Sequence, residues 1–236
     1  MTLNRRSALL GVLALPTGCA NRALSPFATT AVPAPSGSGV LRAPRVGQSW
    51  TYRKLNFFNG SLLDVVQETV ASVGSTVDVS RQSNSGAALA DEKHAVWGQL
   101  LRDPAWDYPM TFETPVPLWP ASLAGDARTT INSHYFMDDG SFRHWVQVSC
   151  VVRNWDRVTV GAGTFDTLRI ERLIRLEHHD FSRVYTLRRD TMWLSLEVGR
   201  WVARDTSGEY GQAGDPGMLR NYSQEDHLHW ELTAWQ

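Results

Sequence analysis

Several residue types are scarce in this chain of 236 residues, and each shortage excludes a class of protein. Lysine occurs only at Lys54 and Lys93, cysteine occurs only at Cys19 and Cys150, and the formal net charge is -1. Two cysteines, one of them close to the N-terminus, exclude a disulfide framework for the folded domain. A nearly neutral chain has no bulk attraction to nucleic acid or anionic lipid, so we expect no nucleic-acid partner.

The N-terminal residues contain an apolar run, Ala8 to Leu15, that is too short to cross a bilayer as a helix. Arg5 and Arg6 precede this run and Gly18-Cys19 follows it, which is the order of an export signal. The stretch resembles the signal of bacterial lipoproteins, in which the cysteine is diacylated and becomes the new N-terminus. The resemblance implies a signal peptide over residues 1–18 and lipidation at Cys19.

The same resemblance implies an address in the cell envelope of a Gram-negative bacterium. Ala20 follows Cys19, in place of the Asp that resembles a signal for retention at the inner membrane. This favours an anchor in the outer membrane on its periplasmic face, with a soluble periplasmic protein as the alternative. Arg5 and Arg6 also loosely resemble a twin-arginine signal, so the export route stays open, and so does the oligomeric state.

Composition divides the rest of the chain into a tether and one domain. Residues 19–45 are rich in Ala, Pro, Ser, Thr and Gly and have few large apolar side chains, so we expect a disordered tether. Residues 46–236 are enough for one core, and their short alternating segments predict a single antiparallel β domain.

The clearest strand pattern runs from Phe165 to Glu177. Leu168, Ile170, Arg172, Ile174 and Leu176 share one face of it, because side chains alternate along a strand. Similar patterns at 142–153 and 181–188 predict that this strand is the centre of an antiparallel sheet. We expect a mainly β fold in which one strongly curved sheet forms an open or half barrel, with at most one or two short helices.

Two segments are harder to interpret. Residues 86–102 fit either a helix or a strand from His94 to Leu101, and Gly98 weakens the helix. Residues 103–126 contain five prolines, which donate no hydrogen bond to a strand ladder, so this stretch predicts a long loop over the sheet.

Turn glycines and packing aromatics carry a second resemblance, mainly over residues 142–203. Gly163-Thr-Phe-Asp-Thr167, Met192-Trp193 and Val198-Gly-Arg-Trp-Val202 are similar to a pattern in uncharacterised envelope lipoproteins of Gram-negative bacteria. Their fold is thought similar to the open β-barrel of the lipoprotein carrier LolA and acceptor LolB. The resemblance implies this fold, and it carries no catalytic residue to this chain.

Arg172 is the most informative candidate for ligand binding, because it lies on the apolar face between Ile170 and Ile174. An arginine there needs either an internal carboxylate or the head group of a bound ligand. Trp193 and Trp201 lie in the same part of the chain and complete the candidate ligand site. Pairing of Arg172 with a carboxylate on a neighbouring strand is the alternative.

The candidate metal ligands lie near the C-terminus. His227 and His229 are two residues apart, with Glu225 and Glu231 at matching positions, so all four share a face if the segment is a strand. Such a row could bind zinc or copper, although a solvated strand face has the same pattern. Catalytic Ser elbows, phosphate-binding glycine loops and paired CxxC motifs do not occur, and we expect no cofactor.

Three functions remain. The first is a non-enzymatic, lipid-anchored protein that binds a hydrophobic or amphiphilic ligand, or an envelope protein. The second is a structural accessory subunit of an envelope complex with no ligand cavity. The third is a metal-dependent activity at His227 and His229. Barrels of this size can hold one small ligand, which favours the first.

Overall fold

The computed structural model describes residues 29–35, 39–138, 140, 142–213 and 222–236. These residues form β-strands and turns and no helix, which confirms the mainly β class. Nothing in the described ranges is therefore a helix long and apolar enough to cross a membrane. The signal segment 1–18 and Cys19 lie outside the described residues.

Fourteen strands are present in the described part of the chain. They are β1 (Thr29–Val32), β2 (Ser49–Asn56), β3 (Leu62–Val73), β4 (Val77–Ser83), β5 (Ala88–Val96), β6 (Gln99–Asp103), β7 (Met110–Pro117), β8 (Arg128–Phe136), β9 (His144–Val160), β10 (Gly163–Leu176), β11 (Arg183–Ser195), β12 (Arg200–Gln212), β13 (Tyr222–Gln224) and β14 (Leu228–Trp235).

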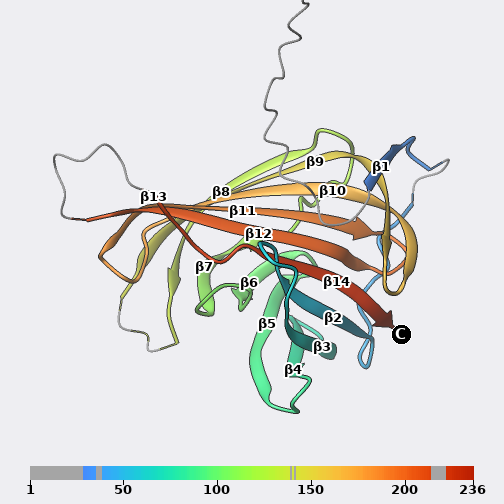
Figure 1. Cartoon of the computed structure of the whole chain (residues 1–236), viewed down its shortest axis with the longest axis horizontal. Coiled ribbons are helices and arrows are strands. Elements are labelled where there is room, and N and C mark those ends of the chain that lie inside the picture. Colours follow the sequence, from blue (N-terminus) through green and yellow to red (C-terminus); the bar gives the residue numbers. More distant parts are fainter. Residues whose placement is uncertain (1–28, 36–38, 139, 141, 214–221) are drawn as a thin grey trace, which may run out of the picture.

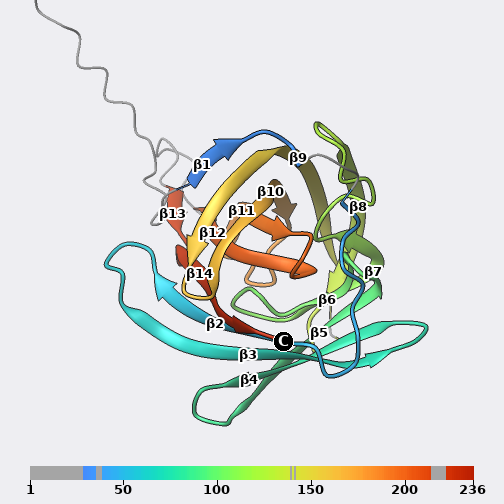
Figure 2. The same ribbon diagram turned by 90° about the vertical axis from the view of Figure 1, so that its right-hand side faces the viewer.

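Twelve of these strands close into an antiparallel barrel (Figure 2). The order is β9-β10-β11-β12-β14-β2-β3-β4-β5-β6-β7-β8, and β8 pairs back with β9. β1 adds to β9, and β13 adds to β12. The expected open or half barrel is therefore wrong. Closure pairs both edges of the sheet, which removes the exposed edges that an open barrel would leave.

The error came from the proline-rich stretch 103–126, which we expected to be a loop. Its residues 110–117 form β7, which bridges β6 and β8 and so completes the ring. β7 pairs with β8 only at Thr111 and Phe112, before its prolines begin. Pro115 and Pro117 lie beyond that contact, where no hydrogen bond to β8 is required of them.

Residues 86–102 form a tight hairpin of β5 and β6, which settles the choice between helix and strand. Gly98 at its turn has φ +90°, a left-handed conformation that glycine adopts without the steric penalty of a side chain. A helix would have needed this residue in its middle, so the same glycine that weakens the helix makes the turn.

Part of the expected tether is ordered. Residues 29–32 form β1, which pairs with β9 from Val158 to Trp155. Residues 39–45 pack against the turn between β11 and β12, where the Arg42 amide donates to the Leu196 carbonyl at 2.9 Å and Leu41 touches the core. Backbone pairing and one apolar contact order this segment, although its composition is typical of a disordered chain.

Figure 1 shows β9 to β12 side by side along the long axis, with β2 to β5 crossing below them. The expected central strand is confirmed, because β10 pairs with β9 on one side and β11 on the other. We call the left-hand end of these strands in Figure 1, at the β10–β11 turn (177–182), the pocket end. The right-hand end, at the β11–β12 turn (196–199), is the capped end.

Candidate functional site

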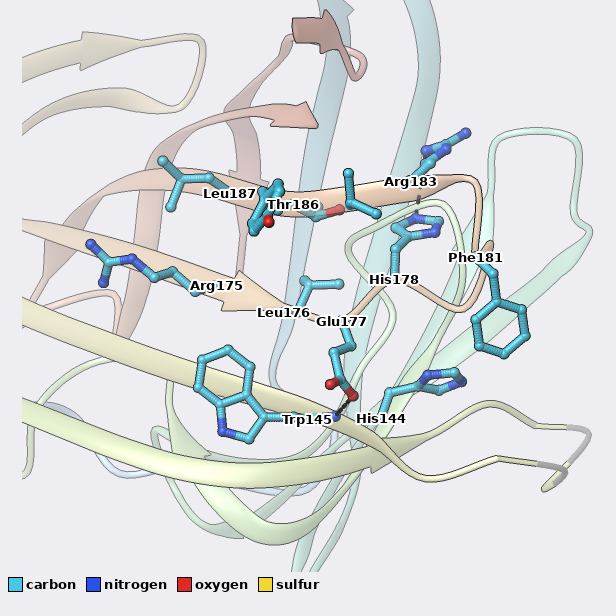
Figure 3. A pocket seen from close by; sticks show the side chains of 12 residues that line it. His144, Trp145, Arg175, Leu176, Glu177, His178, Phe181, Arg183, Thr186 and Leu187 are labelled. Atoms are coloured by element: carbon cyan, nitrogen blue, oxygen red, sulfur yellow. Dashed lines mark hydrogen bonds between the residues drawn. The ribbon is translucent and has the colours of Figure 1, made fainter. Parts of the chain in front are cut away.

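An opening of about 810 Å³ lies at the pocket end, between β9, β10 and β11 (Figure 3). Its lining is mainly apolar and aromatic, and the volume is within the range of small-molecule sites. The lining side chains are His144, Trp145, Arg175, Leu176, Glu177, His178, Phe181, Arg183, Val184, Tyr185, Thr186 and Leu187. These side chains come from both faces of the sheet, so the opening passes through the barrel wall at the pocket end.

The opening exists because β10 and β11 separate there. Their last paired residues are Leu176 and Thr186, and the pairing of β11 with β12 shifts register between Val184 and Leu187. Tyr185 within this irregularity has φ 54°, which is uncommon for a residue with a bulky side chain, and its ring is 84% exposed. Backbone strain of this kind concentrates at functional sites, because the fold must hold it in place.

The polar groups of the pocket are mostly hydrogen-bond donors. The Glu177 carboxylate is already used, since it accepts the Trp145 amide at 3.0 Å. His178 Nδ1 accepts the Asp180 amide at 3.0 Å, so the neutral ring carries its proton on Nε2. Thr186 is buried, and its hydroxyl has no hydrogen-bonding partner in the described structure.

Exposed aromatic side chains gather around this opening. Phe142 and Phe181 meet edge to face with centroids 5.8 Å apart, and Tyr108 packs on His179 at 4.4 Å. Tyr185 lines the opening, and Tyr222 is paired with Gly211, which in turn pairs with Val184. Of the largely exposed aromatic residues in the described ranges, all but Phe58 belong to this group. Exposed apolar groups that cluster mark interaction sites more often than scattered ones do.

One group of potential metal ligands lies beside the pocket: Asp107, His178 and Glu225 have donor atoms within 4.8 Å of one another. Arg188 already occupies both carboxylates, at 2.8 Å from Asp107 and 2.7 Å from Glu225. His178 Nε2 carries a proton, so it offers no lone pair to a metal. Burial raises the pKa of Asp107, but the His178 hydrogen bond and the Arg188 charge outweigh it and hold that pKa well below its usual range. The group is an ion-pair cluster.

The four residues expected to bind a metal do not form one group in the structure. Glu225 turns to Arg188 at the pocket end, and His227 stacks on Phe57 with centroids 3.8 Å apart. His229 hydrogen-bonds Asp205 and also Glu231, which pairs with Arg53. His229 and Glu231 therefore stay together, and Glu225 and His227 have other partners.

Protonation also disfavours metal binding at this row. Burial lowers the pKa of His229, but hydrogen bonds to Asp205 and Glu231 outweigh it and raise the pKa. The His229 hydrogen bond lowers the pKa of Glu231 to about 2. A metal needs a neutral imidazole, whereas this arrangement stabilises the protonated ring.

The three expected ligand-binding residues lie away from the opening. Arg172 is fully buried and donates to Asp190 at 2.6 Å, which is the internal pairing that we gave as the alternative. Trp193 donates to Asp156 at 3.2 Å, and Trp201 stacks on Tyr52 at 3.9 Å. None of the three lines the opening at the pocket end. Arg172 borders a second pocket of about 460 Å³ on β8 to β11.

Three ion-pair clusters follow one another along the barrel. Two of them are buried, and each contains two arginines and two carboxylates, so its charge cancels internally: Arg81, Arg200, Glu68 and Glu92; and Arg172, Arg204, Asp103 and Asp190. Buried charges require such pairing. The two buried clusters therefore leave no surplus charge for a ligand. The third cluster, at the pocket end, is partly exposed and contains Arg183, Arg188, Asp107, Asp180 and Glu225.

Cys150, the one cysteine among the described residues, is 1% exposed. Burial raises the pKa of its thiol to about 12, so the thiolate that would react is disfavoured. Sequence reasoning missed the pocket, because its lining comes from both faces of two strands and a turn. The only local signal was the turn at His178-His179-Asp180 between two strand patterns.

No protein-family model matches the chain, and no curated protein matches it in sequence. Solved structures do match. A candidate lipoprotein from Parabacteroides distasonis aligns with TM-score 0.53 and 15% identity, covering 85% of this chain and all of that one. A candidate exported protein with a YmcC-like fold from Bacteroides fragilis aligns with TM-score 0.50 and 11% identity, covering 84% of this chain and all of that one.

A third solved structure, the hypothetical lipoprotein YmcC from Escherichia coli, aligns more weakly, with TM-score 0.45 and 10% identity over 80% of this chain and 84% of that one. At these identities the likeness concerns the fold alone. It agrees with the coarser part of the resemblance, a β-barrel of the kind found in uncharacterised candidate lipoproteins. It does not support LolA and LolB specifically, and the closed ring differs from their open barrel.

Proposed function

We propose that this protein is a non-enzymatic, lipid-anchored binding protein of the bacterial envelope, and that its pocket end holds a hydrophobic or amphiphilic ligand. The observation that carries the proposal is the opening of about 810 Å³ between β9, β10 and β11. Leu176, Leu187 and Trp145 offer it apolar area, and exposed aromatic rings surround it. Aromatic groups of this kind supply much of the area in binding sites.

Binding fits the residues better than catalysis does. A catalytic pair needs a nucleophile or base within hydrogen-bond reach of an activating group, next to space for a substrate. Around the opening, His178 is fixed by the Asp180 amide, and Glu177 is fixed by the Trp145 amide. Neither is placed beside a Ser, Cys or Lys that it could activate among the lining residues.

The signal-like residues 1–19 and the fold support the envelope address. The Parabacteroides protein with a similar fold is described as a lipoprotein, and the Bacteroides one as exported. Lipidation at Cys19 would tie the chain to the outer membrane on its periplasmic face. Nine residues, 20–28, separate Cys19 from Thr29, the first residue of β1, and such a stretch reaches about 35 Å at most.

A structural accessory subunit is the second candidate. The two buried ion clusters favour it, because they fill the barrel with groups that need no ligand. In that case the aromatic group at the pocket end would be a protein contact.

Native mass spectrometry of the full chain, expressed in a Gram-negative bacterium, separates the two candidates. We expect a co-purified small amphiphile with the wild-type chain, and its loss in Leu187→Trp, which fills the opening. Leu173→Trp is the matched control, since Leu173 lies on β10 outside the opening, and it should keep the ligand. Repeated absence of any ligand from the wild-type chain would favour the accessory role.

The anchor is tested separately. Cells that express the wild-type chain are labelled with radioactive palmitate and compared with cells that express Cys19→Ala. We expect label only in the wild-type chain. Equal labelling of both chains would overturn lipidation at Cys19 and leave the pocket proposal unaffected.

A further inference from the structure

The polar part of the pocket indicates which class of amphiphile fits. Arg175, Arg183, His178 and Thr186 offer N–H or O–H groups to the opening, and its one carboxylate, Glu177, already accepts an amide. Asp107 and Glu225 lie behind Arg183 and His178 and do not line the opening. A lining with more donors than acceptors suits a ligand head group rich in acceptor oxygens.

A second observation about the polar part of the pocket comes from Thr186. Its side chain is 2% exposed and lines the opening, and its hydroxyl has no partner in the described structure. Buried polar groups are nearly always hydrogen-bonded, because an unpaired one is costly. A hydroxyl left unpaired at the wall of a pocket therefore points to a partner that arrives from outside the chain.

Arg183 is available to the same head group. Its Nη1 lies 3.7 Å from Asp107 Oδ2 and 3.5 Å from Glu225 Oε1, and its Nε lies 3.6 Å from Asp180 Oδ2. These ion pairs are longer than good hydrogen bonds, whereas Arg188 holds Asp107 and Glu225 at 2.7–2.9 Å. In Figure 3, Thr186, His178 and Arg183 lie along one side of the pocket, and the guanidinium of Arg175 extends away from them.

We infer that the ligand is an anionic amphiphile, with an acyl-like chain against Trp145, Leu176 and Leu187 and a carboxylate or phosphate that accepts hydrogen bonds from Thr186 and Arg183. The inference rests on the proposed function, since it names the ligand class of the same pocket. The carboxylate and the phosphate share the chemistry that matters, which is negative charge with several acceptor oxygens.

The test uses the full chain carrying Cys19→Ser, so that no detergent competes with the ligand. Dodecanoate, dodecyl phosphate and uncharged dodecanamide are titrated below their aggregation concentrations and followed by calorimetry. We expect both anions to bind at least about tenfold more tightly than the amide, because hydrogen bonds to charged groups are the stronger ones. The two anions distinguish a carboxylate head group from a phosphate.

Thr186→Val removes the hydroxyl and keeps the shape. We expect about tenfold weaker binding of the preferred anion, together with a Tm of the ligand-free protein that is unchanged or raised by about 2–4 °C, because an unpaired buried hydroxyl disappears. Thr206→Val is the matched control: its hydroxyl is also buried and unpaired, but it does not line the opening. It should show the same Tm change with unaltered affinity.

The outcomes separate the inference from the function on which it rests. Weaker binding in Thr186→Val, with Thr206→Val unaffected, supports the inference. Equal binding of the anions and the amide, or unchanged affinity in Thr186→Val, overturns the anionic ligand and leaves a pocket for neutral amphiphiles. Failure of all three compounds to bind the parent chain overturns the proposed function itself.

Discussion

Both ends of β9 to β12 are formed by hairpin turns, but other residues cover the capped end and the pocket end is open. At the capped end, Trp97 donates to the Gly199 carbonyl at 2.9 Å and Gln48 to the Val198 carbonyl at 3.1 Å, so residues 39–48 close over the turn. At the pocket end β10 and β11 separate beyond the Leu176–Thr186 pair, and aromatic rings are exposed.

The two ends differ in how much their residues contribute to the stability of the fold. The capped end places its tryptophans around Arg200, which stacks on Trp50 and Trp97 and pairs with two glutamates. The pocket end keeps Tyr185 at a strained positive φ, which lowers stability. Sites that bind a partner commonly sacrifice stability in this way. Substitutions at the capped end should therefore change stability, and those at the pocket end should change binding.

The largest expected effect is that of Arg200→Met at the capped end. It leaves Glu68 and Glu92 buried without their main partner, which should lower the free energy of unfolding by about 3–5 kcal/mol. Chemical denaturation measures it. Arg189→Met is the control, because the Arg189–Glu209 pair is exposed and should contribute no more than about 1 kcal/mol. Equal effects of the two variants would contradict the comparison.

Gly98→Ala should have the next largest effect. A Cβ there would lie 2.2 Å from Nε1 of Trp119, and φ is +90°, so the clash and the backbone strain together should lower stability by about 3 kcal/mol. Gly86→Ala shares the positive φ (+85°) but meets nothing within 4 Å, so it should lower stability by only about 1 kcal/mol. Thermal denaturation of both variants isolates the contribution of the tryptophan contact.

Asp107→Asn tests the ion cluster of the pocket end, where the effect should be smaller and dependent on pH. The pKa of Asp107 is lower in the folded protein than in the unfolded chain, so its contribution is present above the ordinary pKa of aspartate, about 3.9, and is lost as the pH falls further. At pH 7 we expect a loss of about 1 kcal/mol or less, since the carboxylate is partly exposed. The difference from the wild-type chain should shrink below pH 4, and growth of that difference in acid would refute the assignment.

Phe181→Ser should have the smallest effect on stability, within about 0.5 kcal/mol, because its ring is 69% exposed. It lines the opening, so the co-purified ligand should be reduced or lost in native mass spectrometry. Phe58→Ser is the matched control, since Phe58 is 67% exposed on the β2–β3 turn and does not line the opening. Loss of the ligand in both variants would indicate a general effect of surface aromatics.

The strands could be predicted where side chains alternate cleanly. The segment 165–177 was placed correctly at the centre of the sheet. Closure of the ring could not be predicted, because it depends on Thr111 and Phe112 meeting β8, and nothing near those residues specifies that partner. The order of residues 29–32 within the expected tether could not be predicted for the same reason, since β1 is ordered by β9, more than a hundred residues away.

The prediction of functional residues has the same limit, because partners that are distant in the chain could not be predicted. Arg172 was correctly marked as an arginine that needs a partner, but whether that partner was Asp190 or a ligand depended on strand register. The row at 225–231 satisfied the spacing for metal ligands, yet Glu225 turned to Arg188 and His227 to Phe57. Spacing along one strand fixes a face, and it does not fix which groups lie across from that face.

Local patterns in the sequence are enough to predict the class of fold and the need of Arg172 for a charged partner, because these follow from the alternation of side chains and the desolvation of a charge. Closure of the barrel, the pairing of its buried charges in two clusters, and the separation of β10 and β11 beyond the Leu176–Thr186 pair are properties of the tertiary structure. Those outcomes depend on contacts between residues far apart in the chain, which no local pattern records.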